Sequence, residues 1–188
     1  DWYTSVATMT FSSLDLMVLA TQFPILALVW RREPGRDHIF WLLIAAAFLG
    51  PFLWSITAHA VAWQAELTAA LWTTIAATWG LFTFLCVYEK EAWRLIAIIA
   101  PVLFIMAVLA IIWSGQHGQS PTTEIPGAAR GAGLGLHIAV SVATYGLLTI
   151  AAAAGSAGII QDRTLKSKQP TARSRNLPAL SDCDAMMF

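Results

Sequence analysis

Five long apolar stretches dominate this sequence and constrain its fold more than any other feature. A helix that crosses the hydrocarbon core of a bilayer needs about 20 mostly apolar residues. Stretches of this kind cover approximately residues 6–30, 38–63, 67–88, 92–113 and 132–160. Only 12% of the 188 residues are charged, whereas a soluble domain carries about a quarter charged residues. The sequence therefore predicts an all-α, polytopic transmembrane helix bundle of about five helices over residues 1–160.

The connections between the apolar stretches are short and polar. The first of them contains Pro34-Gly35 among charged residues, so we expect the chain to leave the hydrocarbon there. Residues 161–188 are basic and polar, and we expect a cytoplasmic tail or a linker to missing helices. Because the sequence starts at Asp1 and stops at Phe188 just as an apolar run begins, we also expect it to be a fragment at both ends.

The basic residues predict the orientation of the bundle. Cytoplasmic connections carry an excess of Lys and Arg. On alternate connections, ten of the 11 basic residues fall on one side, namely Arg31, Arg32, Arg36, Lys90, Arg94, Arg163, Lys166, Lys168, Arg173 and Arg175, and Arg130 alone falls on the other. This asymmetry predicts that the N-terminus is outside and that the tail is cytoplasmic.

Composition and motifs exclude several classes of function. With a net charge of zero, no face can present the basic stripe that nucleic acid requires, so nucleic acid is not an expected partner. The sequence contains no P-loop, Rossmann fingerprint, HExxH or CxxC motif. Ser156 is near the predicted inner end of its helix, whereas His59 and His137 are near the outer ends, so they cannot form a nucleophile and base pair. We therefore expect no catalytic residues and no enzyme activity.

Two histidines inside apolar stretches are the candidate binding residues. His59 lies four residues before Trp63 and His137 lies seven after Arg130, which places each within about 10 Å of the outer surface at 1.5 Å per residue. A neutral imidazole is a good axial ligand for haem iron, so His59 and His137 are predicted to bind haem iron. Trp54, Trp72 and Trp79 could wall such a site. The alternative is that each histidine only donates a hydrogen bond to a neighbouring helix.

The remaining polar residues leave several interpretations open. Asp15 either marks the outer boundary of the first helix or relays a proton. His38 is most simply an interfacial residue. His117 is either solvated or, as a loop histidine, passes a ligand inward. Three predicted helices contain an interior proline, at Pro24, Pro51 and Pro101, each of which removes a backbone donor. On the last apolar stretch, one helical face is richer in hydroxyls and is expected to point into the bundle; it comprises His137, Ser141, Thr144, Tyr145, Leu148 and Gly155.

The last apolar stretch also resembles a known family. Its sequence from Leu136 to Ala151 reads LHIAVSVATYGLLTIA, and it is followed by Leu165-Lys166 and by Leu177-Pro178-Ala179-Leu180. This combination resembles the cytochrome c assembly family of CcsA, CcmC and HemX types, and is most similar to its inner-membrane YpjD-like branch. In that branch the second helix carries a histidine in an "HA" context like His59-Ala60.

The resemblance implies a location, a cofactor and partners. It implies a multi-pass protein of the bacterial inner membrane, surrounded by lipid, that binds or hands over haem at the outer face to haem-delivery or cytochrome c maturation partners. His137 would correspond to the family's outer-face histidine that precedes the tryptophan-rich segment, and His59 to its helix-two histidine. Asp184 would correspond to an acidic residue after the Leu-Pro-x-Leu element. Family members have about eight helices, and their tryptophan-rich outer segment is not found in this sequence.

Two other functions are compatible with the sequence. Interior prolines and small residues on helix faces are also typical of a permease-like transporter subunit, although such a subunit would use a polar pathway at the bilayer midplane. A regulatory membrane protein of haem biosynthesis would instead contact soluble partners through the basic tail. The charge-poor midplane argues against the transporter.

Overall fold

The computed structural model describes residues 2–29, 35–61, 67–117 and 132–167. Some side chains within these ranges are not described, including those of residues 2–13, 59–61 and 115–117. Over these residues the chain forms five α-helices and one short 3₁₀ helix. They are α1 (Trp2–Val29), α2 (His38–Val61), α3 (Leu67–Tyr88), η1 (Ala92–Leu95), α4 (Ile96–His117) and α5 (Ala132–Ser167). The described part contains no strand, which confirms the all-α prediction of five helices.

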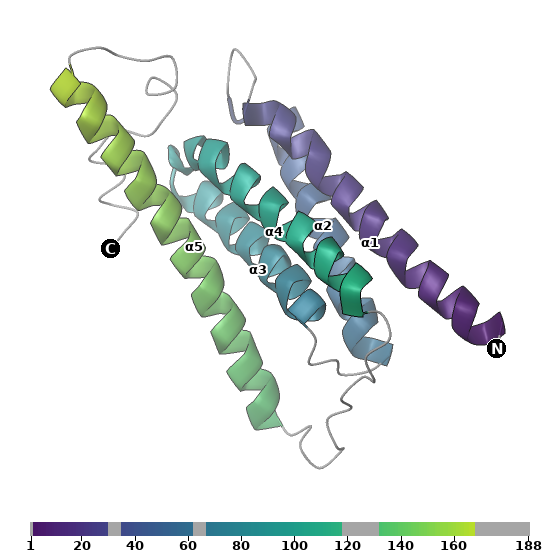
Figure 1. Ribbon diagram of the computed structural model, residues 1–188. Coiled ribbons are helices and arrows are strands. Elements are labelled where there is room, and N and C mark those ends of the chain that lie inside the picture. The colour runs from purple at the N-terminus through teal and green to yellow at the C-terminus, as the bar shows by residue number, and fades with distance from the viewer. Residues whose placement is uncertain (1, 30–34, 62–66, 118–131, 168–188) are drawn as a thin grey trace.

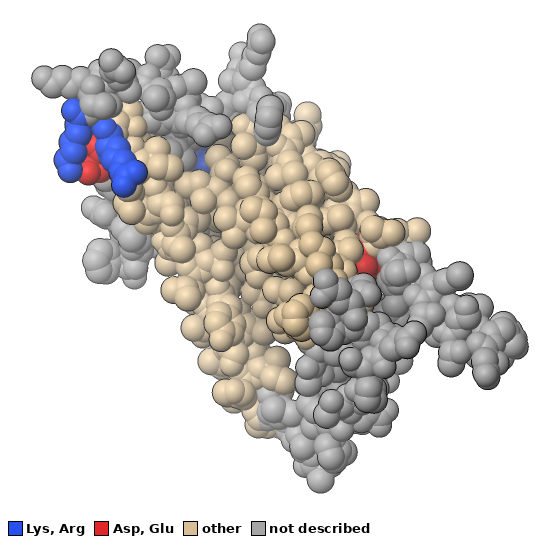
Figure 2. Space-filling model, in the orientation of Figure 1, with Lys and Arg blue, Asp and Glu red and all other residues tan. Residues whose placement is uncertain are grey.

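Four helices are long and apolar enough to cross a membrane. Their apolar spans are His38–Ala58, Leu67–Tyr88, Ala92–Ser114 and Gly135–Thr164. In α1, the residues whose side chains are described form a shorter apolar segment, Leu14–Val29. Successive helices run in opposite directions (Figure 1). In Figure 2 the broad middle of the visible face is almost entirely uncharged. The chain is therefore a multi-pass membrane protein.

Local sequence explains where two of the helices begin or end. The Asp37 carboxylate accepts a hydrogen bond from the Phe40 backbone N–H at 3.0 Å, so Asp37 caps the start of α2. Helix α5 continues to Ser167, seven residues past the predicted end at 160. Its last turns carry an ion pair between Lys166 and Asp162 at 2.7 Å, one helical turn apart. A charged extension can remain helical where the chain leaves the membrane.

Helix α3 forms the centre of the bundle. It packs against α2, α4 and α5, whereas α1 packs against α2 and α4 on the far side (Figure 1). Four large α3 side chains are fully buried: Trp72, Ile75, Trp79 and Phe82. Helix α5 approaches α3 closely at Gly146, where an added Cβ would lie 2.9 Å from the Leu81 Cδ1 atom. A larger residue at position 146 would force the Leu81 side chain to shift, so glycine favours this close contact.

A buried glutamine compensates for the proline inside α2. Pro51 has no N–H, so the Ala47 carbonyl four residues earlier receives no helical hydrogen bond. The Gln22 side chain on α1 donates to that carbonyl at 2.9 Å and accepts a hydrogen bond from the Trp79 indole of α3, also at 2.9 Å. Gln22 thereby satisfies the carbonyl that the proline leaves unpaired and connects three helices in the apolar interior.

Candidate functional site

His137 lies near the start of α5 and its side chain is exposed. Its backbone carbonyl accepts a hydrogen bond from the Ser141 hydroxyl at 2.8 Å. The side chain is not part of the packed interior of the described bundle, so it is available to a ligand or partner at that end of the helix.

The prediction that the hydroxyl-rich face of α5 points into the bundle is wrong. Tyr145 is 61% exposed and Leu148 is 64% exposed, and Thr144 is exposed as well. The buried face of α5 is instead built from glycine, alanine and one isoleucine: Gly146, Ile150, Ala153, Ala154 and Ala157. Small residues let the helices approach closely, while the Thr144 hydroxyl bonds the Val140 carbonyl of its own helix at 2.8 Å and needs no partner across an interface.

His59 lies on α2, two residues before the helix ends at Val61, and its side chain is outside the described residues. Because α2 ends and α5 begins at the same end of the bundle, His59 and His137 share that end (Figure 1). Helix α3, however, packs between α2 and α5. The structure therefore places the two histidines on helices that are not neighbours. His117 ends α4 at the same end, whereas His38 begins α2 at the opposite end.

The three tryptophans that could have walled a haem site are packed inside the bundle. Trp72 and Trp79 are 0% exposed and Trp54 is 6% exposed. The Trp54 and Trp72 rings contact each other, with centroids 6.1 Å apart. They fill the interior between helices and do not line a surface that is open at the His137 side of α5.

A buried carboxyl cluster forms where four helices meet. Asp15 of α1 is 3% exposed, and its Oδ2 atom accepts a hydrogen bond from the Ser114 hydroxyl of α4 at 2.9 Å. The indoles of Trp54 and Trp72, from α2 and α3, face the same carboxyl. Their N–H groups and the Asp15 Oδ1 atom are buried and lack partners of good hydrogen-bond geometry. Sequence reasoning singled out Asp15 but not this cluster, because its partners come from three separate helices.

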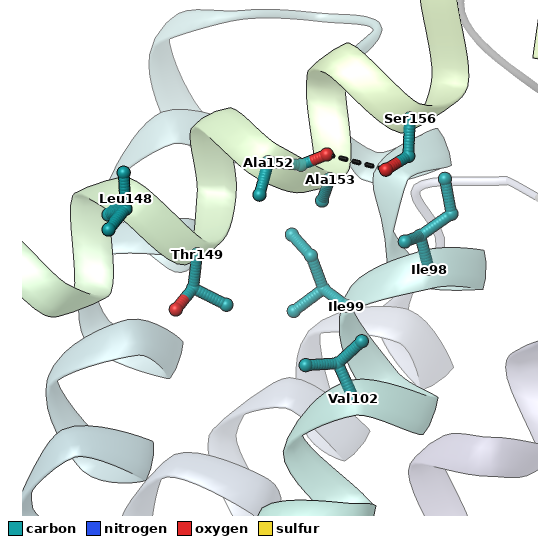
Figure 3. Close-up of a pocket in the computed structure, with 8 residues that line it drawn as sticks. All are labelled: Ile98, Ile99, Val102, Leu148, Thr149, Ala152, Ala153 and Ser156. Carbon is teal, nitrogen blue, oxygen red and sulfur yellow. Dashed lines mark hydrogen bonds between the residues drawn. The ribbon is translucent and has the colours of Figure 1, made fainter. Parts of the chain in front are cut away.

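A groove of about 330 Å³ lies between α4 and α5 (Figure 3). Its lining is Ile98, Ile99, Val102, Leu148, Thr149, Ala152, Ala153 and Ser156. The Ser156 hydroxyl donates to the Ala152 carbonyl at 2.7 Å and the Thr149 hydroxyl donates to the Tyr145 carbonyl at 2.8 Å. Both hydroxyls are engaged within α5, so the groove has an apolar character and offers little to a polar ligand.

Metal ligands are not clustered in the part of the chain that the structure describes. No group of three or more His, Cys, Asp or Glu side chains there could hold a metal ion between them. One exposed imidazole, that of His137, fits the role of a single axial ligand to haem iron, which needs only one or two protein ligands. Helix α3 lies between the helices that carry His59 and His137. A haem bound by both histidines of one chain would therefore have to reach across the end of α3.

These features define the class of the chain as a multi-pass α-helical membrane protein with an exposed histidine face and a buried acid. It is 37% identical over 179 residues to a protein of Azospirillum brasilense described as an uncharacterized 28.8 kDa protein in a nifR3-like 5′ region. The alignment covers 95% of this chain and 65% of that relative, so the chain spans about two thirds of the relative's length. No family model and no solved structure matches the chain.

Proposed function

We propose that the chain belongs to a membrane protein of cytochrome c assembly type that binds haem, or hands it over, at the outer face of the inner membrane. The observation that carries this proposal is the exposure of the α5 face on which the family resemblance rests. His137 and Tyr145 lie on that face, and the opposite face supplies the packing against α3. Residues that are not needed for packing can serve a ligand.

Haem at this site would supply an iron that requires axial ligands and a large apolar ring. His137 would hold the iron through one imidazole nitrogen, and the exposed apolar side chains of Leu136 and Val140 beside it would contact the ring. His59 is the second ligand that we propose, from the same end of the bundle. Docking partners that deliver or accept haem would reach this face from outside the described bundle.

The buried polar groups count against the alternative of a transporter subunit. A pathway at the midplane needs polar groups that are available to a substrate. In the described interior, the Gln22 amide donates a hydrogen bond to the Ala47 carbonyl and accepts one from the Trp79 indole. Helix–helix contacts use these three groups, so they are not available to a substrate.

The proposed orientation places the histidine end of the bundle outside. Arg36, Lys90 and Arg94 lie in the connections at the end opposite to His137, and α5 finishes at that end with Arg163 and Lys166. A reporter fused after Arg175 is expected to be cytoplasmic and one fused after Gln119 to be external, because basic residues are retained inside. Activity of the two fusions with an alkaline phosphatase reporter measures this, and the reverse pattern would exclude an outer haem site at His137.

Axial ligation can be tested by absorption spectroscopy of the purified protein with added haem. His137→Ala and His59→Ala are each expected to lose the low-spin spectrum of the wild type, because an axial ligand is removed. His38→Ala is the matched control, since it removes a histidine from the opposite end of the bundle. If both outer variants keep their helical content and the wild-type spectrum, neither histidine binds the iron.

A further inference from the structure

The buried cluster around Asp15 is separate from the exposed face of α5. Asp15 is an acid within the apolar part of α1, and ionisable groups at such positions are costly, so they are functional candidates by default. The neighbouring side chains offer O–H and N–H donors, from Ser114, Trp54 and Trp72.

Ser114 connects the carboxyl to the end of the bundle. It is the last residue of the apolar span of α4 and is partly exposed, whereas Asp15 is 3% exposed. Its hydroxyl is hydrogen-bonded to the Asp15 Oδ2 atom at 2.9 Å. A hydroxyl can accept one proton while it donates another. The Ser114 side chain is therefore placed to pass a proton between the surface and a buried carboxyl.

We propose that Asp15 is a proton-binding site that exchanges with water at the histidine end of the bundle through the Ser114 hydroxyl. In the forward step the Ser114 Oγ–H bond breaks and its proton goes to Asp15 Oδ2, forming a carboxylic acid. Ser114 Oγ takes a proton from a hydronium ion, which leaves as water. One proton and one positive charge move from solvent to the carboxylate, and Ser114 returns to its starting form.

Trp54 and Trp72 act as positioning residues in this proposal. Their indole N–H groups face the Asp15 carboxyl, and these groups and the Asp15 Oδ1 atom are buried and unpartnered. Leaving a buried N–H donor unpaired costs free energy. The two indoles therefore favour positions of the Asp15 carboxyl that keep one of its oxygens near their N–H groups. Because the indoles are directly beside the carboxyl, protonation of Asp15 changes their electrostatic environment and hence their fluorescence.

Few other titratable groups lie on the described helices around Asp15. The sequences of α2, α3 and α4, which supply the side chains next to Asp15, contain five: His38, His59, Cys86, Tyr88 and His117. The short helix η1 before α4 adds Arg94. His38, Cys86, Tyr88 and Arg94 belong to the opposite end of the bundle. His59 and His117 share the end near Asp15 and are controlled by His59→Ala and His117→Ala variants.

The test is the tryptophan fluorescence of the full chain in detergent as the pH is lowered, with the rate recorded after a rapid pH jump. Wild-type protein is expected to show an acid-induced change that Asp15→Asn abolishes and that Ser114→Ala slows. Asp162→Asn removes an exposed acid at the opposite end, and Trp79→Phe removes an indole paired with Gln22, so both should retain the change. A folded Asp15→Asn protein with the wild-type response would overturn the proposal.

A second measurement covers the case in which Asp15→Asn does not fold. The infrared difference spectrum of wild-type protein between neutral and acid buffer is expected to contain the carbonyl band of a buried carboxylic acid. Trp72→Phe removes an N–H group that faces the Asp15 carboxyl and should shift that band, whereas Trp79→Phe should not. Absence of the band, or a band that is insensitive to Trp72→Phe, would also overturn the proposal.

Discussion

Gln22→Leu is expected to lower the free energy of unfolding by about 2–6 kcal/mol, because it leaves two buried groups without partners at about 1–3 kcal/mol each. The groups are the Ala47 carbonyl and the Trp79 indole N–H, which Gln22 now satisfies from α1. Gln22 itself is 1% exposed, so water does not replace it readily. Unfolding of the purified protein in mixed detergent micelles measures the loss.

Gln22→Leu should lower the free energy of unfolding by a smaller amount in a Pro51→Ala background. Alanine at position 51 restores a backbone N–H to the Ala47 carbonyl, so that only the indole remains unpaired when Gln22 is removed. The loss of unfolding free energy caused by Gln22→Leu is compared between the wild-type and Pro51→Ala backgrounds. The difference isolates the interaction of Gln22 with the carbonyl that the proline leaves unpaired. Equal costs in both backgrounds would show that Gln22 does not compensate for Pro51.

The helices of this chain could be predicted from the sequence because each apolar stretch has to satisfy its own backbone in the membrane. The extension of α5 to Ser167 was missed because its last turns are charged and were assigned to the tail. An Asp162 and Lys166 pair at helical spacing was the available signal. Hydropathy locates spans, and it does not show where a helix continues beyond the hydrocarbon.

Helix order and inward faces could not be predicted in the same way. The hydroxyl-rich face of α5 was expected inside, but hydroxyls such as that of Thr144 bond to their own helix and are exposed. The buried face of α5 instead consists of Gly146, which lies against α3, Ile150 and three alanines. In lipid, where burial of apolar area gives no preference between faces, fit between small residues decides which face is buried.

The residues of the candidate sites could be predicted from the sequence, but the contacts between them could not. Asp15 was visible as an acid in an apolar stretch, but Ser114 falls just beyond the stretch predicted over residues 92–113, and the two lie 99 positions apart. Their contact depends on α1 packing against α4, which no spacing encodes. For the histidines, spacing predicted a shared end of the bundle, and the interposed α3 could not be foreseen. Haem ligation by His59 and His137 stays a prediction.

Exchange of the ligand at position 137 tests haem binding at the α5 face most directly. His137→Cys replaces an imidazole by a thiol whose thiolate gives ferric haem a different spectrum. His38→Cys makes the same replacement at the opposite end of the bundle. We expect the absorption and electron paramagnetic resonance spectra of the His137→Cys complex to become those of thiolate-ligated haem while His38→Cys retains the wild-type spectra. A His137→Cys complex that is identical to the wild type would contradict haem ligation by His137.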